Sequence, residues 1–484
     1  MNAPLLPLAR ADLLSGALPM PGGPVRRADI PVTDKASGRI LAHVPHLSRA
    51  EVAAAVAAAR DAMPAWAAKT AKERSQVLRR WFDAVMAHQE DLAVLMTAEQ
   101  GKPLSESRAE IAYAASFIEW FAEEGKRAYG DVIPSPTPGR RILVLKQPIG
   151  VTAAITPWNF PAAMITRKAA PALAAGCAML VKPATATPLS AIALARLAHE
   201  AGLDPRLLVV VTGKASDIAA EFTENPTIRK ISFTGSTEIG RDLMARASRH
   251  IQKLSLELGG NAPFIVFDDA DLDAAVEGAI ACKFRNAGQT CVCANRIYVQ
   301  SGVHDAFVER LAARVRALAV GPGLAPGSEV GPMIDAAAVA KVEEHLADAL
   351  AHGATLRAGG ARHPLGGTFF APTLVTGVTS AMKVAHEETF GPLAPIFRFD
   401  TEEEAIHFAN ATEYGLAAYL YARDAGRIFR VAERLEYGIV GINTGIISNE
   451  VAPFGGWKES GVGREGSRYG LDEYLELKYL NLAL

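Results

Sequence analysis

The segments Leu256-Glu257-Leu258-Gly259-Gly260 and Gly288-Gln289-Thr290-Cys291-Val292-Cys293 enclose the stretch around which this chain is organised. Each segment places one reactive side chain, the Glu257 carboxylate or the Cys291 thiol, beside glycines that permit tight turns. A carboxylate and a thiol in such settings are typical of a general base and a nucleophile. We therefore interpret Glu257 and Cys291 as a catalytic pair that the fold brings together.

The surroundings of Cys291 favour catalysis over the ordinary role of a cysteine as an inert buried side chain. The turn 288–290 can bring backbone N–H groups near the thiol, and Arg285 and Arg296 add positive potential. Both effects are expected to lower the pKa of the thiol. Glu257 lies between two leucines, where burial is expected to raise its pKa. The alternative for Glu257 is a solvated or ion-paired carboxylate.

Both segments resemble the two active-site signatures of the aldehyde dehydrogenase superfamily, and the resemblance covers essentially the whole chain. Within it, the chain is most similar to the bacterial, NADP-preferring succinate-semialdehyde dehydrogenases. The resemblance implies an α/β fold with two doubly wound Rossmann-type domains and a small β arm for oligomerisation. It also implies NAD(P)-dependent oxidation of succinate semialdehyde to succinate, through a thiohemiacetal and a thioester on the cysteine.

Composition limits the classes of function. The chain has 484 residues, 50% of them hydrophobic and 21% charged, with a net charge of −2. Two or three domains are expected, and there is no electrostatic case for binding nucleic acid. Four cysteines are too few for a disulfide framework, so we predict a cytoplasmic protein without a structural metal. The uncharged stretch 147–166 contains three prolines and is not predicted to cross a membrane.

Strand-like and helical stretches alternate from Val151 to Glu257. The alternation predicts parallel strands with crossover helices, which form a doubly wound sheet. A second alternating region begins at 264–267 and is interpreted as the domain that carries Cys291. The predicted division is a dinucleotide-binding domain (1–127, 146–256 and 443–465), a catalytic domain (257–442) and an oligomerisation arm (128–145 and 466–484).

Two capping boxes mark helices near the N-terminus. Ser48 with Glu51 predicts a helix to about residue 63, and Thr70 with Glu73 predicts one longer helix that ends before Gly101. Strand-like segments in 128–145 and 474–484 resemble the oligomerisation module of the superfamily, so a homodimer or homotetramer is expected. The alternative is that each segment edges the sheet of its own domain.

Three strand ends carry candidate cofactor residues, because ligands of doubly wound sheets bind beyond the carboxyl ends of the strands. The resemblance implies that the oxyanion is stabilised by Asn159, although this side chain could instead cap the helix that Pro161 begins. The segment 233–240 follows a strand and opens a helix, and the resemblance implies that a pyrophosphate binds there, although Ser236 also fits as an N-cap. The predicted cofactor residues are Thr156, Trp158, Lys182, Ala184, Thr185, Gly235, Ser236, Gly240, Glu388 and Phe390.

The resemblance also implies a choice of cofactor. Strongly NAD-preferring members carry a glutamate where this chain has Thr185, and that carboxylate would repel a 2′-phosphate. The absence of a carboxylate here permits NADP, with NAD accepted as well. Glu388 is expected to hold the nicotinamide ribose and Phe390 to pack near the ring; the alternative for this segment is a helix-ending turn.

Three polar residues match positions that hold the distal carboxylate of succinate semialdehyde in the enzymes this chain resembles: Arg167, Arg285 and Ser448. Guanidinium groups suit this task because they form charge-assisted hydrogen bonds of defined geometry. The alternative is that both arginines pair with acidic residues on the surface.

Cys293 invites a separate hypothesis, namely a strained disulfide with Cys291 that switches activity off, as in related enzymes with this C-x-C loop. It could equally be a packed thiol. Two alternatives concern the substrate and the chemistry. The substrate could be glutarate semialdehyde, which is one methylene longer, or the protein could be a cysteine-dependent hydrolase, for which the sequence identifies no histidine partner.

Overall fold

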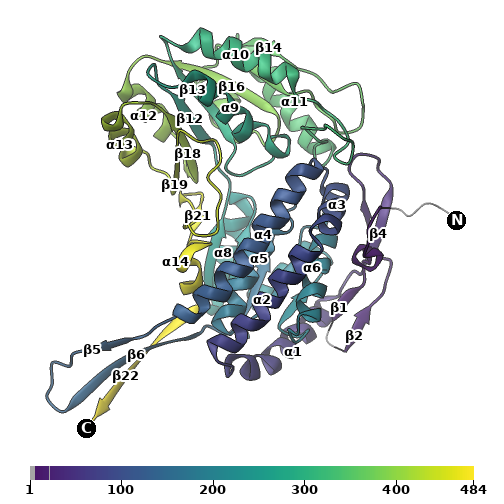
Figure 1. Cartoon of the computed structure of the whole chain (residues 1–484), viewed down its shortest axis with the longest axis vertical. Helices are drawn as coiled ribbons and strands as arrows, with labels where there is room; N and C mark the ends of the chain where they lie inside the picture. Colours follow the sequence, from purple (N-terminus) through teal and green to yellow (C-terminus); the bar gives the residue numbers. More distant parts are fainter. Residues whose placement is uncertain (1–5, 21) are drawn as a thin grey trace.

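The computed structural model describes residues 6–20 and 22–484; residues 1–5 and 21, which the predicted dinucleotide-binding domain includes, lie outside the described part. Figure 1 shows two α/β regions, one above the other, and a long β arm that projects from the lower region. The α/β fold with doubly wound sheets is therefore confirmed.

The lower region is built on a six-stranded sheet of order β21-β11-β10-β7-β8-β9. Its central strands pair in parallel, and only β21 is antiparallel, against β11. Four apolar runs predicted as strands become β7 (Val151–Ile155), β8 (Ala178–Lys182), β9 (Leu208–Val210) and β10 (Ile228–Thr234). The sheet is completed by β11 (Lys253–Glu257) and the late strand β21 (Gly461–Val462). The crossover helices are α5 (Ala163–Ala175), α6 (Leu189–Glu200), α7 (Ala215–Glu224) and α8 (Thr237–Ala247).

The N-terminal segment packs around this sheet (Figure 1). Short strands, β1 (Leu18–Met20) with β2 (Gly23–Val25) and β3 (Ile30–Thr33) with β4 (Ile40–Val44), precede α1 (Arg49–Ala67). Both capping boxes are present, at Ser48 and Thr70. The single helix predicted from Thr70 to Gly101 is wrong, because the chain breaks at His88 into α2 (Ala71–Ala87) and α3 (Gln89–Gln100) before α4 (Leu104–Glu124).

The upper region contains a seven-stranded sheet of order β14-β15-β16-β13-β12-β18-β19. Its strands are β12 (Ala262–Val266), β13 (Ala294–Gln300), β14 (Thr355–Ala358), β15 (Thr373–Thr376), β16 (Leu393–Phe399), β18 (Ala417–Tyr421) and β19 (Ile439–Ile442). Its helices are α9 (Leu272–Lys283), α10 (His304–Ala317), α11 (Ala336–Ala351), α12 (Glu402–Asn410) and α13 (Ala425–Arg434). The sheet is parallel except for β14, so it is also doubly wound.

The arm is a sheet of its own with the order β22-β6-β5. β6 (Arg140–Pro148) pairs along its whole length with β22 (Leu475–Ala483), and β5 (Asp131–Ile133) covers its other edge. The alternative in which each segment edges the sheet of its own domain is therefore wrong. Among the described residues, no helix is long and apolar enough to cross a membrane, and no cluster of side chains is arranged to hold a metal ion.

Candidate active site

Cys291 follows a loop of unusual backbone shape. The 3₁₀ turn Arg285–Gly288 ends with three consecutive left-handed residues: Asn286 (φ 52°), Ala287 (φ 55°) and Gly288 (φ 75°). A Cβ at position 288 would lie 2.2 Å from the carbonyl oxygen of Gly391, so this position requires glycine. Residues other than glycine rarely adopt this left-handed backbone region, and where they do the surrounding contacts must hold them there.

Two cavities meet at Cys291. One, of about 280 Å³, has Cys291 in its wall together with Tyr113, Arg167, Arg285 and Ser448. The other, of about 240 Å³, also has Cys291 in its wall. Its other lining residues are Pro157, Trp158, Asn159, Thr234, Gly235, Ser236, Leu258, Gly259, Glu388 and Phe390. The thiol therefore lies where the contents of the two cavities would come into contact. We call them the arginine cavity and the glycine cavity.

The arginine cavity offers unpaired donors to an anion. Arg167 is buried, its guanidinium lies 4.0 Å from the Phe454 ring centroid, and it forms an ion pair with Glu465 at 2.6 Å. Its Nη2 and the Nε of Arg285 have no hydrogen-bond partner among the described residues. The alternative of surface ion pairs is wrong for Arg167, whose acid partner is buried, and Arg285 has no salt bridge within the described part of the chain.

Tyr113 is a residue of this cavity that sequence reasoning missed. It lies on α4, and its buried hydroxyl has no hydrogen-bond partner among the residues described. Burial raises the pKa of this phenol, so the group is a neutral donor at physiological pH. No local signal in the sequence sets Tyr113 apart from its neighbours on this helix.

The glycine cavity has the walls that a dinucleotide needs. Trp158 and Phe390 meet edge to face with ring centroids 5.6 Å apart, and a carboxylate oxygen of Glu388 accepts a hydrogen bond from the Gly260 N–H at 3.4 Å. Ser236 caps α8, and a Cβ at Gly235 would lie 2.4 Å from the Phe233 ring. A helix N-terminus beside small residues is suited to a pyrophosphate.

The other predicted cofactor residues lie at the edge of this cavity. Gly240 packs on Leu258, which is part of the cavity wall. Thr156 and Lys182 lie at the carboxyl ends of neighbouring parallel strands. Ala184 and Thr185 come shortly after Lys182 in the chain; Ala184 is half-buried and Thr185 is exposed. Burial lowers the pKa of Lys182, whose ammonium has no hydrogen-bond or salt-bridge partner among the described residues. These positions fit a ribose or phosphate group.

Asn159 does not cap a helix. α5 begins at Ala163, and the N–H groups of Ala162 and Ala163 donate to the Glu110 carboxylate at 3.0 and 3.3 Å. The Asn159 amide instead donates to the carbonyl oxygen of Gln289 at 3.1 Å, two residues before Cys291. The capping alternative is therefore wrong, and the amide lies against the loop that carries the thiol.

Glu257 is buried at the end of β11, beside Thr234 of β10, which lies in the wall of the glycine cavity. Both carboxylate oxygens lack a hydrogen-bond partner among the described residues. Burial, followed by the charge of Glu465, raises its pKa well above the usual range, so the alternative of a solvated carboxylate is wrong.

Glu465 was not singled out from the sequence. Despite burial, which alone would raise it, the ammonium of Lys168 and the guanidinium of Arg167 keep the pKa of Glu465 below its usual value. Lys168 also donates to the Thr234 hydroxyl at 2.6 Å. The base candidate Glu257 thus lies beside a compact group of buried charges contributed by α5 and by the segment after β21.

The expected lowering of the thiol pKa is wrong for this structure. Burial, then the charge of Glu388, raises the pKa of Cys291 to about 12, against the opposing effects of Arg167 and Arg285. Arg296 is directed elsewhere, since its guanidinium donates to the carbonyl oxygens of Asn261, Phe408 and Ala409. Cys291 is therefore a thiol until a base removes its proton.

Cys293 is buried, and its Sγ lies 3.4 Å from the carbonyl oxygen of Lys283. No histidine lies in the walls of the arginine and glycine cavities. A Cys–His hydrolase arrangement is therefore absent from both cavities in the described part of the chain. A larger cavity, of about 890 Å³, lies elsewhere, between the N-terminal segment and α6, and contains none of the predicted site residues.

Comparison with known proteins decides the family. Residues 24–480 match the model of the aldehyde dehydrogenase family. The chain belongs to the aldehyde dehydrogenase family. Its α/β fold and its class of reaction, cofactor-dependent oxidation of an aldehyde, follow from this membership.

Individual relatives of this aldehyde dehydrogenase are similar over most of its length. It is 64% identical to the glutarate-semialdehyde dehydrogenase of Pseudomonas aeruginosa and to the NADP(+) succinate-semialdehyde dehydrogenase GabD of Escherichia coli, with 94% of each chain covered in both cases. The crystal structure of succinate-semialdehyde dehydrogenase from Burkholderia pseudomallei superimposes with a TM-score of 0.97 at 60% identity, covering 99% of this chain and 100% of that one.

Proposed function

We propose that this aldehyde dehydrogenase oxidises succinate semialdehyde to succinate with NADP, and accepts NAD. The observation that carries the proposal is the position of Cys291 between the arginine cavity and the glycine cavity. A short aldehyde whose far end is a carboxylate would be held by Arg167, Arg285 and Ser448, with its carbonyl carbon at the thiol. Charge-assisted hydrogen bonds to two guanidinium groups would fix its orientation.

The proposed reaction begins when the proton of the Cys291 thiol passes to solvent water, and the sulfur adds to the aldehyde carbon and forms a thiohemiacetal. The Asn159 amide stabilises the oxyanion of this adduct together with the Cys291 backbone N–H. Bound NADP supplies the acceptor for the hydride that leaves the thiohemiacetal carbon. Glu257 then takes a proton from water, the resulting hydroxide attacks the Cys291 thioester, and the acid departs as the thiol is restored.

The cofactor assignment rests on the fit of the glycine cavity. Glu388 would accept hydrogen bonds from ribose hydroxyls, Trp158 and Phe390 would enclose the ring, and Gly235, Ser236 and Gly240 would approach the pyrophosphate. Lys182, Ala184 and Thr185, with Thr156 beside them, would face the adenosine end. Thr185 carries no charge and Lys182 is a cation, so a 2′-phosphate meets attraction rather than repulsion there.

A substitution of Arg285 tests the proposed substrate more directly than one of Arg167. Arg167 forms a salt bridge with Glu465, whereas Arg285 forms none among the described residues. Arg285→Gln is expected to raise the KM for succinate semialdehyde about 10- to 100-fold, the equivalent of about 1.5–3 kcal/mol for a charged hydrogen bond. The KM for butanal, which has the same carbon chain without the carboxylate, should be unchanged. Steady-state kinetics with both aldehydes and both cofactors measures this. An equal rise in KM for the two aldehydes would contradict the proposed binding of the carboxylate by Arg285.

Glutarate semialdehyde is a second candidate, because the Pseudomonas aeruginosa relative is as similar to this chain as the Escherichia coli one. One methylene changes binding by about 1–3 kcal/mol in a pocket. Values of kcat/KM for the C4 and C5 semialdehydes should therefore differ at least several-fold. A larger value for the C5 compound would replace the proposed substrate and leave the chemistry unchanged.

We also infer that the arm joins copies of this chain into a dimer or tetramer. Its outer strand β22 leaves Leu477 69% and Tyr479 58% exposed, which is unusual for large apolar side chains on an open sheet. Leu477→Glu combined with Tyr479→Glu should reduce the mass measured by light scattering to that of a smaller species. Lys478→Gln, on the opposite face of the strand, should leave the mass unchanged. A monomeric wild-type protein would refute the inference.

Cys293 is proposed as a redox partner of Cys291. In the structure its Sγ contacts the Lys283 carbonyl, so it must leave this contact to reach Cys291. Mild peroxide would oxidise the two thiols to a disulfide and be reduced to water, and dithiothreitol would reverse the change. We expect reversible loss of activity in the wild type and none in Cys293→Ala. Cys282→Ala, which removes another buried thiol, serves as the control and should respond like the wild type. An unaltered response in Cys293→Ala refutes the switch.

A further inference from the structure

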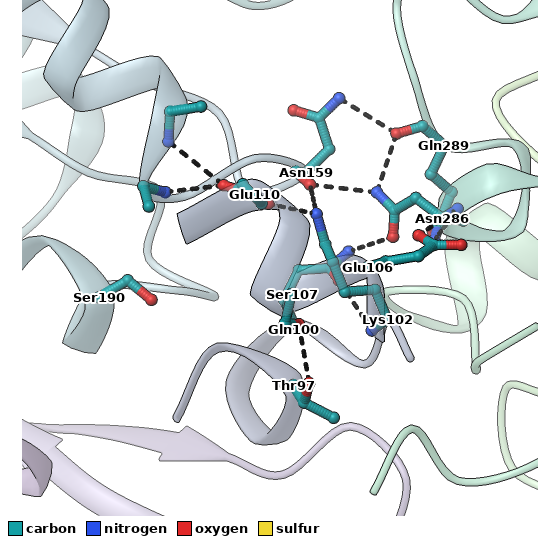
Figure 2. Close-up of polar contacts among 12 residues, drawn as sticks. Thr97, Gln100, Lys102, Glu106, Ser107, Glu110, Asn159, Ser190, Asn286 and Gln289 are labelled. Carbon is teal, nitrogen blue, oxygen red and sulfur yellow. Dashed lines mark hydrogen bonds and ion pairs between the residues drawn. The ribbon is translucent and has the colours of Figure 1, made fainter. Parts of the chain in front are cut away.

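Asn286 joins the turn that carries Asn159 to the loop that carries Cys291. Its Nδ2 donates to the carbonyl oxygens of Asn159 at 3.1 Å and of Gln289 at 3.2 Å. Its Oδ1 accepts from the side chain of Gln100 at 2.9 Å, and its backbone N–H donates to Glu106 at 2.8 Å. Figure 2 shows these groups converging on one buried point between α3, α4 and the Cys291 loop. The polar groups of this side chain are thus fully engaged.

The carbonyl oxygen of Asn159 is also held from the other side. Lys102 donates to it at 2.7 Å and forms an ion pair with Glu110 at 2.5 Å, and both side chains are buried (Figure 2). Glu110 in turn accepts from the backbone N–H groups at the start of α5. The main chain from the Asn159 carbonyl to the start of α5 is therefore held by Glu110 of α4 and by Lys102 in the segment before α4. Movement of the Cys291 loop is therefore what would change the distance between the Asn159 amide and the thiol.

The Cys291 loop needs such a restraint because of its backbone. Asn286 and Ala287 both have left-handed φ values, of 52° and 55°. Asparagine adopts this region more readily than other side chains, but alanine does not, so the conformation depends on external contacts. The contacts of Asn286 described above are suited to supply them. The carbonyl oxygen of Gln289, which receives both the Asn159 amide and Asn286 Nδ2, is the point where the two segments meet.

We propose that Asn286 is a positioning residue that sets the Asn159 amide at its working distance from Cys291. The inference rests on the roles proposed above for Asn159 and Cys291. Asn286 does not touch the substrate in this scheme; it acts through Asn159. Loss of its two Nδ2 bonds leaves the bond from the Asn159 amide to the Gln289 carbonyl to hold the two segments together, so the oxyanion meets a donor that is less well preorganised.

The test compares two glycine variants of adjacent left-handed residues. Asn286→Gly removes the side-chain bonds, whereas Ala287→Gly allows the same backbone flexibility and removes no hydrogen bond. We expect Asn286→Gly to lower kcat and the rate of the pre-steady-state NADPH burst about 10- to 100-fold, with the KM for the aldehyde changed less than about 3-fold. Ala287→Gly should stay within about 3-fold of the wild type in both rates. Thermal melting of each variant shows whether the fold is retained.

A double variant separates positioning from a merely structural role. If Asn286 acts through Asn159, the burst of Asn159→Ala/Asn286→Gly should match that of Asn159→Ala alone within about 3-fold. Independent, multiplying effects in the double variant, or equal losses in Asn286→Gly and Ala287→Gly, would overturn the inference. If Asn286→Gly does not fold, Asn286→Asp replaces it in the same comparison. It has the same shape but lacks the Nδ2 donors, and the same loss of burst rate is expected.

The Asn159→Ala variant tests the proposed function separately from the positioning role of Asn286. A wild-type burst in Asn159→Ala would refute the oxyanion role itself, whatever Asn286→Gly does. A slow burst in Asn159→Ala combined with a wild-type burst in Asn286→Gly would refute only the positioning role.

Discussion

Cys291→Ala is expected to lower the oxidation of succinate semialdehyde at least about 10⁴-fold, to a rate indistinguishable from that without enzyme. The reason is chemical: without the sulfur no thiohemiacetal forms, and the aldehyde hydrogen has no adduct from which to leave. The arginine and glycine cavities keep their other walls, so binding of NADP should persist. The appearance of NADPH absorbance measures the loss, and quenching of protein fluorescence by NADPH measures binding.

Cys177→Ala is the matched control. Cys177 is a buried thiol just before β8 whose Sγ lies 3.5 Å from the carbonyl oxygen of Tyr474, and it is not in the wall of the arginine or the glycine cavity. The variant should lose a small amount of thermal stability and retain wild-type kcat. Turnover by Cys291→Ala above about one hundredth of the wild-type rate would contradict a covalent mechanism.

Glu257→Gln is expected to give one burst of NADPH per active site followed by turnover about 10²- to 10⁴-fold slower than in the wild type. The amide has nearly the shape of the carboxylate but cannot take a proton from water, so the thioester forms and persists. Rapid-mixing measurements resolve the burst, and mass spectrometry of the quenched protein should find the acyl group on Cys291. Repeated turnover at the wild-type rate would refute the base role. A missing burst would instead assign Glu257 to deprotonation of the thiol.

The pH dependence of the wild type follows from the raised pKa of Glu257. A general base works only when deprotonated, and burial together with Glu465 shifts its protonation to higher pH than for an ordinary carboxyl group. The kcat of the wild type should therefore fall as pH falls through this raised pKa, well above the pH range in which an exposed glutamate titrates. The slow turnover of Glu257→Gln should lack that acid limb.

Local patterns in the sequence predicted the elements of the fold well. The capping boxes at Ser48 and Thr70 place two helix starts correctly, because both partners of such a box lie within four residues. The break at His88 was missed because the helical pattern of α2 continues into α3 and no glycine or proline marks the break. Alternation of strands and helices identified both sheets, since parallel strands require crossover helices.

The candidate site was predictable only in part. Cys291, Asn159 and the two cavity arginines lie together as expected. Arg296 was assigned wrongly, because its guanidinium donates to the carbonyl oxygens of Asn261, Phe408 and Ala409. The expected low thiol pKa failed because burial outweighs the two nearby arginines. The Lys102 and Asn286 contacts with Asn159 join segments 57 and 127 residues apart, and a single sequence contains no signal for such pairs.

The pairing of Arg167 and Lys168 with Glu465 has a consequence for biosynthesis. The carboxylate lies 297 residues downstream of the lysine that it neutralises. While a ribosome is still making that intervening polypeptide, two cations of α5 lack their counter-ion and cannot be dehydrated without a large penalty. We therefore expect this helix to dock only loosely on the emerging chain, and the six-stranded sheet to reach its final order only after residue 465 has left the ribosome.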